Sequence, residues 1–98
     1  MSPCCKSKVH FSKEDACRVA AALGVNVNNP CFNIDQFWKG LNVELEHGLI
    51  DPNTNVTNND PILTGKIALA HLNEYPDYYT RLARMEKEAK EYWSKIIR

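Results

Sequence analysis

The stretch that decides the fold is FWKGLNVELEHGLIDPNTNVTNNDPILTGKIALAHLNEYPDYY, which runs from Phe37 to Tyr79. Two apolar segments with helical spacing flank a segment rich in Asn, Asp, Thr and Pro, which is typical of a loop. Asn and Asp side chains in such a loop tend to build turns on their own backbone. Pro76 removes a backbone donor and crowds the preceding turn. The stretch therefore predicts two helices joined by a loop, with a further helix beginning after Pro76.

The first two helices have start and stop signals. Ser12 is a good N-cap, and Gly24 suits the end of the first helix. Asn33 is the N-cap of the second helix, with Gln at its third helical position. Gly48 is the residue at which we expect this second helix to end, because glycine tolerates the left-handed conformation that follows many helices.

The third and fourth helices are separated by proline. Asp60 is an N-cap followed by Pro61, and proline suits the first helical position. Pro76 ends the third helix and opens a fourth that runs almost to Arg98. We therefore predict an all-α fold, a compact four-helix domain.

Length and charge limit the classes of function. The chain has 98 residues, enough for one modest core, and we predict a flexible tail over residues 1–10 and a single helical domain over residues 11–98. The 12 Lys and Arg balance the 12 Asp and Glu, so no net field favours nucleic acid or anionic membranes. The chain lacks an apolar run of membrane-spanning length and a secretory signal at its start. We predict an intracellular protein, in the cytoplasm of a cell or infected host, with nucleus and virion as alternatives.

The third and fourth helices differ in polarity. The third is apolar almost all round, with Lys66 and Asn73 on a polar edge, and a helix of this kind is expected at the buried centre of a domain. The fourth is amphipathic, with a charged face opposite an apolar one. We expect its apolar residues to pack into the core: Tyr78, Leu82, Met85, Ala89, Tyr92, Trp93 and Ile96.

The four cysteines are not spaced like a disulfide framework. A reducing cytosol would keep them as thiols. Cys17 and Cys31 are predicted to be small buried apolar residues. Cys4 and Cys5 fall in the predicted tail.

Two short motifs of mirrored order carry the chemistry of the chain: Glu44-x-x-His47 and His71-x-x-Glu74. Residues three apart are neighbours on a helix surface. His71 and Glu74 lie on an otherwise apolar helix, and titratable groups that point inward are costly unless they are paired, hydrogen-bonded or ligating. The motifs therefore mark a candidate site.

This candidate site has two interpretations. Glu44, His47, His71 and Glu74 could bind zinc, manganese or iron, and water on such a metal becomes a nucleophile at neutral pH. Alternatively they form a buried polar network that fixes the helix packing, in which the two glutamates accept hydrogen bonds from His71, Tyr78 or Lys66. No other cofactor is predicted.

Three classes of function follow. The missing nucleophile–base pair and phosphate loop favour a non-enzymatic binding or scaffolding module, acting on a protein partner or by self-association. Its surface would be the charged side of the fourth helix or the loop over residues 51–60. One alternative is a metal-dependent hydrolase that uses the four site residues. The other is nucleic-acid binding with steep salt dependence, through Lys6, Lys8, Lys13, Arg18, Arg81, Arg84 and Lys87.

The same segments carry a resemblance to a known family. The motifs ELEHG, TGKIALAHL and PDYYTRL, with KEDACRVAAALGV nearer the N-terminus, resemble a family of small helical proteins of unknown function found in bacteria, phages and large DNA viruses of amoebae. The resemblance covers about residues 11–93 and leaves out the tail. It implies no established activity, so the choice among functions rests on the residues themselves.

Overall fold

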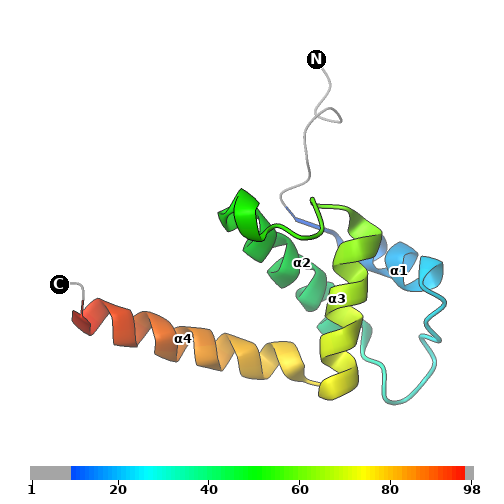
Figure 1. The fold of residues 1–98 in the computed structure, drawn as a ribbon. Coiled ribbons are helices and arrows are strands. Elements are labelled where there is room, and N and C mark those ends of the chain that lie inside the picture. Colours follow the sequence, from blue (N-terminus) through cyan, green and yellow to red (C-terminus); the bar gives the residue numbers. More distant parts are fainter. Residues whose placement is uncertain (1–9, 97–98) are drawn as a thin grey trace.

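The structure, a computed structural model, describes residues 10–96, which form four α-helices and one short 3-10 helix (Figure 1). These elements are α1 (Lys13–Ala22), α2 (Ile34–Ile50), η2 (Pro52–Thr54), α3 (Pro61–Glu74) and α4 (Tyr78–Ile96). The predicted all-α four-helix fold is confirmed. The predicted tail lies outside the described residues apart from His10, which is exposed. Within this part of the chain, no helix has the length and apolar character needed to cross a membrane.

The first three helices begin at the predicted caps. Ser12 and Asp15 form a capping box, in which the Asp15 N–H donates to Ser12 Oγ at 3.1 Å and the Ser12 N–H donates to Asp15 Oδ2 at 2.9 Å. Asn33 and Asp60 accept hydrogen bonds from the first backbone N–H groups of α2 and α3. These side chains satisfy donors that the first turn of a helix leaves without a partner.

The loop after α2 closes onto that helix. α2 continues two residues past Gly48, the predicted end, because Gly48 serves packing instead: a Cβ there would lie 2.7 Å from Asn55 Oδ1. Asn55 Nδ2 donates to Asn59 Oδ1 at 2.9 Å, and Asn58 and Asn59 have positive φ angles of 52° and 65°. The loop thus builds turns from its own Asn side chains, as predicted.

α2 is the helix around which the others pack. It contacts α1, η2, α3 and α4, and it buries Phe37, Leu41 and Leu45 almost completely. Phe32 and Phe37 pack together at the start of α2, with ring centroids 5.6 Å apart. The core therefore lies on the inner side of α2.

α3 is buried along one face rather than all round. Gly65 and Ala68 lie on the buried face, and Gly65 is in such close contact with Val19 of α1 that a Cβ there would clash. On the opposite side Leu63 is 44% exposed. Small residues set the packing face, because they let the helices approach closely, and a chain of this length cannot cover the other side.

The apolar stripe of α4 enters the core only near its start. Tyr79 is fully buried there, and Leu82 is half-buried. Further along, the large apolar residues are more than half exposed: Met85 58%, Tyr92 57%, Trp93 54% and Ile96 56%. Figure 1 shows the C-terminal half of α4 extending past the other helices. The prediction that the whole stripe packs into the core is wrong, because the bundle ends before the helix does.

The prediction for Cys17 and Cys31 is also wrong, because both are exposed free thiols. Cys17 lies away from the face of α1 that buries Ala16 and Ala20, and Cys31 lies in the segment between α1 and α2. The α1 core face is instead made of alanine and valine.

Candidate functional site

Glu44 of α2 is the centre of a polar cluster that joins three helices. Its Oε2 accepts a hydrogen bond from the Tyr79 hydroxyl of α4 at 2.7 Å and lies 2.9 Å from Nδ1 of His71 on α3. The Glu44 side chain is only 10% exposed. A carboxylate with so little contact with water needs donors of this kind. The cluster therefore ties α2, α3 and α4 together at one point.

The imidazole ring of His71 makes polar contacts at its edge and stacks against another ring on its face. Nδ1 lies 2.9 Å from Glu44 Oε2 and 2.9 Å from the Tyr79 hydroxyl. A carboxylate only accepts hydrogen bonds, so we assign a proton to Nδ1, which donates it to Glu44. The Tyr78 ring stacks on the imidazole with centroids 4.4 Å apart and planes inclined by 4°. Nε2 has no hydrogen bond within the described residues.

Tyr79 reaches this cluster because Gly40 leaves room for its ring. A Cβ at Gly40 would clash with the Tyr79 ring, so this pair brings α4 close to α2. Burial, together with the hydrogen bond to Glu44, raises the pKa of the Tyr79 hydroxyl above its ordinary value of 10.0. Tyr79 therefore stays protonated and donates to Glu44 throughout the neutral range.

His47 and Glu86 form the solvent-facing edge of the cluster. His47 Nε2 lies 3.0 Å from Glu86 Oε2, and His47 Nδ1 lies 3.9 Å from Glu44 Oε1. The side chains of His47 and Glu86 are 45% and 43% exposed, and a polar contact in such a place contributes little, about 0–1 kcal/mol even between full charges. Beyond Glu86, every described side chain of α4 is exposed. This edge therefore marks where α4 leaves the bundle.

Three of the four predicted site residues meet in the structure, namely Glu44, His47 and His71. Glu74 does not join them: it is the last residue of α3, it is exposed, and its side chain forms no hydrogen bond or ion pair within residues 10–96. Glu74 lies on the same side of α3 as Leu63 and Ala70, and both of these residues are exposed. For Glu44, the polar-network interpretation agrees with these contacts.

Tyr79 and Glu86 complete the cluster and were not predicted. Tyr78 was predicted as a donor, whereas in the structure Tyr78 stacks on His71 and Tyr79 donates to Glu44. A signal was present, since Tyr79 and Glu86 are seven residues apart and so share one face of a helix. That face lies beside the apolar stripe, where a polar partner on α2 could meet it.

The predicted metal set stays a hypothesis. Among the described residues, no three His, Cys, Asp or Glu side chains converge as metal ligands. Glu44 Oε2 faces the protonated Tyr79 hydroxyl and the Nδ1 of His71. Glu44, His47 and His71 supply the donor atoms that zinc, manganese or iron would need, but they would have to turn away from their present partners.

Three of the seven basic residues predicted for nucleic-acid binding are engaged with carboxylates. Ion pairs join Lys13 to Asp35 at 2.9 Å, Arg18 to Asp15 at 3.1 Å and Arg81 to Asp77 at 2.8 Å. Arg84 and Lys87 are exposed on α4, while Lys6 and Lys8 lie outside the described residues. Phosphate binding draws on unpaired positive charge, and among the described residues of this set Arg84 and Lys87 have no ion pair.

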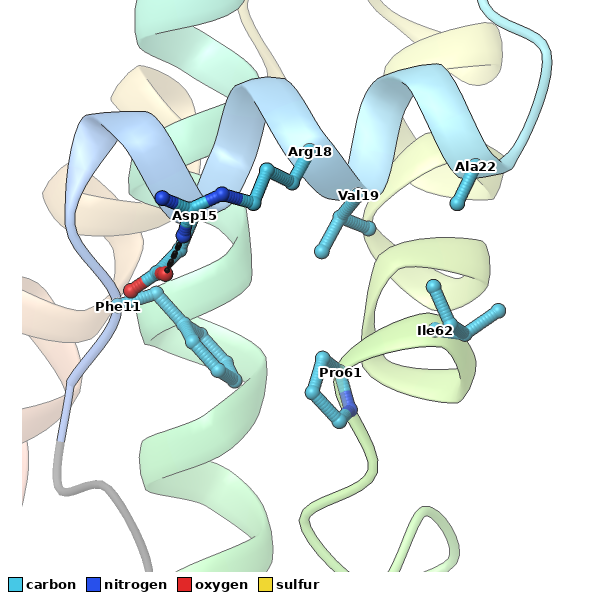
Figure 2. A pocket seen from close by; sticks show the side chains of 7 residues that line it. All are labelled: Phe11, Asp15, Arg18, Val19, Ala22, Pro61 and Ile62. Atoms are coloured by element: carbon cyan, nitrogen blue, oxygen red, sulfur yellow. Dashed lines mark hydrogen bonds and ion pairs between the residues drawn. The ribbon is translucent and has the colours of Figure 1, made fainter. Parts of the chain in front are cut away.

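A shallow apolar hollow of about 360 Å³ lies between α1 and the start of α3 (Figure 2). Val19 of α1 and Ile62 and Pro61 of α3 line it, and the Asp15–Arg18 ion pair lies at its rim. Ligand sites combine apolar walls with a few placed polar groups. This hollow has apolar walls, but the two charged side chains at its rim, Asp15 and Arg18, already form an ion pair with each other.

The outer half of α4 is the second candidate surface. We call it the exposed stripe, and its residues are Met85, Ala89, Tyr92, Trp93 and Ile96. The Tyr92 and Trp93 rings contact edge to face, with centroids 5.1 Å apart. Single exposed apolar residues are ordinary, whereas several on one helix face mark an interaction site. Methionine and aromatic residues are also the types enriched at protein interfaces.

The comparisons with known proteins identify a family for this chain but no activity. Residues 16–88 match the model of a family described as "Protein of unknown function (DUF5661)". Neither the curated proteins nor the solved structures give a significant match. The family match includes the whole Glu44 cluster and ends at Glu88, where α4 already extends beyond the bundle.

Proposed function

The chain belongs to the DUF5661 family, and because that description names no activity, we propose the function from the geometry. The protein is a non-enzymatic binding module that recognises an apolar surface on a protein through the exposed stripe of α4. The observation that carries this proposal is the exposure of four large apolar side chains on one helix face, Met85, Tyr92, Trp93 and Ile96.

The stripe holds enough apolar surface to drive binding. Burying a large apolar side chain completely is worth about 1.5–3 kcal/mol. Because these four side chains are already nearly half covered by their own helix, roughly 1 kcal/mol remains for each. Trp93 and Tyr92 add rigid aromatic area, and such residues often dominate the energy of an interface. A partner that covers the stripe therefore gains several kcal/mol.

The Glu44 cluster gives the stripe a fixed direction. Tyr79 and His71 both contact Glu44 Oε2, and Tyr79 occupies the space that Gly40 leaves. A surface that is already oriented loses less entropy on binding than a flexible one. In this proposal, Glu44 acts through Tyr79 as a positioning residue for α4.

Metal-dependent hydrolysis is the second candidate. The separate contacts of Glu44 with His47 and with His71 favour it, since these are the residue types that hold zinc, manganese or iron. The metal would supply an activated water, and the three residues would hold it. Stoichiometric metal in native protein purified without a tag, together with hydrolysis lost in His71→Ala, would replace the binding proposal with this one.

The experiment compares two double variants of the full chain. Met85→Ala with Trp93→Ala removes the centre of the exposed stripe, and Lys87→Ala with Lys90→Ala changes the opposite, charged face. Each variant and the wild type is used as bait in extract of the native host or infected cell, and captured proteins are quantified by mass spectrometry. We expect capture of a specific partner to fall about tenfold or more for the stripe variant only.

The outcome that contradicts the proposal is equal capture by both variants. Circular dichroism and gel filtration serve as folding controls, and we expect both variants to match the wild type because all four side chains are exposed. Loss of capture with an intact fold then reports on the stripe itself.

Two wider expectations belong with this proposal. The family's occurrence in bacteria, phages and large DNA viruses of amoebae is a prediction from the resemblance of the motifs. An intracellular location is likewise a prediction, supported by a cysteine spacing that does not fit a disulfide framework. Fractionation of the native host or infected cell tests it.

A further inference from the structure

We infer that the partner of the exposed stripe is a second copy of this chain. The two α4 helices run antiparallel, so that Met85 of each copy faces Ile96 of the other. This inference rests on the proposed function, because it names the partner of that surface. It adds an orientation, a register and a pair of charges that the proposed function does not contain.

The spacing of the stripe is that of a two-helix seam. Leu82, Met85, Ala89, Tyr92 and Ile96 follow one another at intervals of three and four residues. This alternation keeps side chains along one line when two helices pack side by side. Leu82 is half-buried against the bundle, whereas the later positions are exposed. The seam therefore lacks a partner over the projecting half of α4.

Side-chain sizes favour the antiparallel arrangement. When Met85 faces Ile96 of the second copy, Ala89 faces Tyr92, so a small side chain lies opposite a large one in both central layers. A parallel arrangement in register would place Ala89 opposite Ala89 and Tyr92 opposite Tyr92, which leaves a gap in one layer and crowding in the next. Interiors and interfaces are densely packed. A contact made twice by one two-fold axis is also the commonest geometry of homodimers.

Two charges beside the stripe complement each other in this register. Glu88 and Lys95 lie on the same flank of α4, seven residues apart, and neither forms an ion pair within residues 10–96. The antiparallel register brings Glu88 of each copy near Lys95 of the other, which makes two pairs. A parallel pair would instead bring Glu88 level with Glu88. Charges at an interface rim set orientation more than affinity.

The shape of the molecule permits this pairing. The bundle is attached to the first half of α4, and the second half extends beyond it (Figure 1). In the antiparallel arrangement the two projecting halves overlap and the two bundles lie at opposite ends. The contact spans about three helical turns, so we expect a weak dimer that forms at roughly micromolar concentrations or above.

Analytical ultracentrifugation of the full chain over a range of concentrations tests the inference. We expect a monomer–dimer equilibrium that Glu88→Lys or Lys95→Glu weakens about tenfold, since each turns two attractive pairs into two repulsive ones. The double variant Glu88→Lys with Lys95→Glu restores the wild-type equilibrium. Glu91→Lys makes the same charge change further round the helix and leaves dimerisation unchanged.

Two outcomes overturn the inference. One is a double charge variant that is as weak as the single variants, because the register then differs. The other is a wild type that stays monomeric up to about 1 mM. If that monomer still captures another protein through Met85 and Trp93, the proposed function stands and only the second copy is rejected. A monomer without stripe-dependent capture rejects both.

Discussion

The two halves of α4 carry the same amphipathic pattern but have different surroundings. From Tyr78 to Glu86 the helix is held by contacts with α2 and α3, including the hydrogen bond of Tyr79 to Glu44. From Lys87 to Ile96 every side chain is exposed. The apolar residues of the second half keep the helical spacing of the first. The same sequence pattern therefore gives a packed apolar face in the first half of α4 and an exposed one in the second half.

The difference between the halves also separates two kinds of polar group. The Glu44 side chain is only 10% exposed and contacts two other helices, so it contributes to the fold. Glu88 and Lys95 flank exposed apolar residues and have no ion pair among the described residues. The role that we propose for them in the dimer is therefore separate from the packing of the bundle.

The largest expected effect compares one tyrosine from each half. Tyr79→Ala removes a fully buried ring and leaves Glu44 with one donor fewer, so we expect a loss of about 3–5 kcal/mol in the free energy of unfolding. Tyr92→Ala removes a ring that is 57% exposed, and the monomer should change by about 0.5 kcal/mol or less. Urea unfolding at low protein concentration measures both. Similar losses for the two variants would show that the halves are not distinct.

A smaller effect comes from the pKa of Tyr79, which burial and Glu44 raise above the ordinary 10.0. Below pH 10 the hydroxyl is protonated in the folded and the unfolded chain, so the contribution of Tyr79 is fully present. Above pH 10 the unfolded chain loses this proton and the folded chain keeps it. We therefore expect the free energy of unfolding to fall by about 1.4 kcal/mol per pH unit from this group.

Tyr79→Phe is the control for this pH dependence. It keeps the ring against Gly40 and has no proton to lose, while the lysines and the other tyrosines titrate as in the wild type. Unfolding in urea at pH 8 and at pH 11 gives the difference for each protein. An equal loss in both proteins would mean that Tyr79 is not held protonated by the fold.

Local signals predicted the fold well because helix ends are decided by neighbouring residues. Ser12, Asn33 and Asp60 cap α1, α2 and α3 as expected, through hydrogen bonds that span two or three residues. Gly48 was misjudged, since its role depends on Asn55, which packs against it only after the loop has closed. Where the role of a residue depends on a contact with a residue far away in the sequence, the local sequence pattern leads to a wrong prediction of that role.

The candidate site shows the same limit. Glu44 and His71 could be named from the sequence, because a titratable group on an apolar helix face calls for a partner. The partner proves to be Tyr79 because α4 crosses α2 at Gly40, where the Tyr79 ring fits. Such a crossing is set by packing between whole helices rather than by the residues of one helix. Glu74 was included because it lies on an otherwise apolar helix, and it stays out of the cluster because its side of α3, with Leu63 and Ala70, is exposed.

Amide hydrogen exchange along α4 in dilute protein tests the division of this helix most directly. Amides between Leu82 and Glu86 should exchange close to the rate of global unfolding, because the Glu44 cluster and the core hold this half. Amides between Lys90 and Ile96 should exchange at least about a hundredfold faster, and they should slow as protein concentration rises and the stripe is covered. Uniform protection along α4 in dilute monomer, unchanged by concentration, would contradict the account.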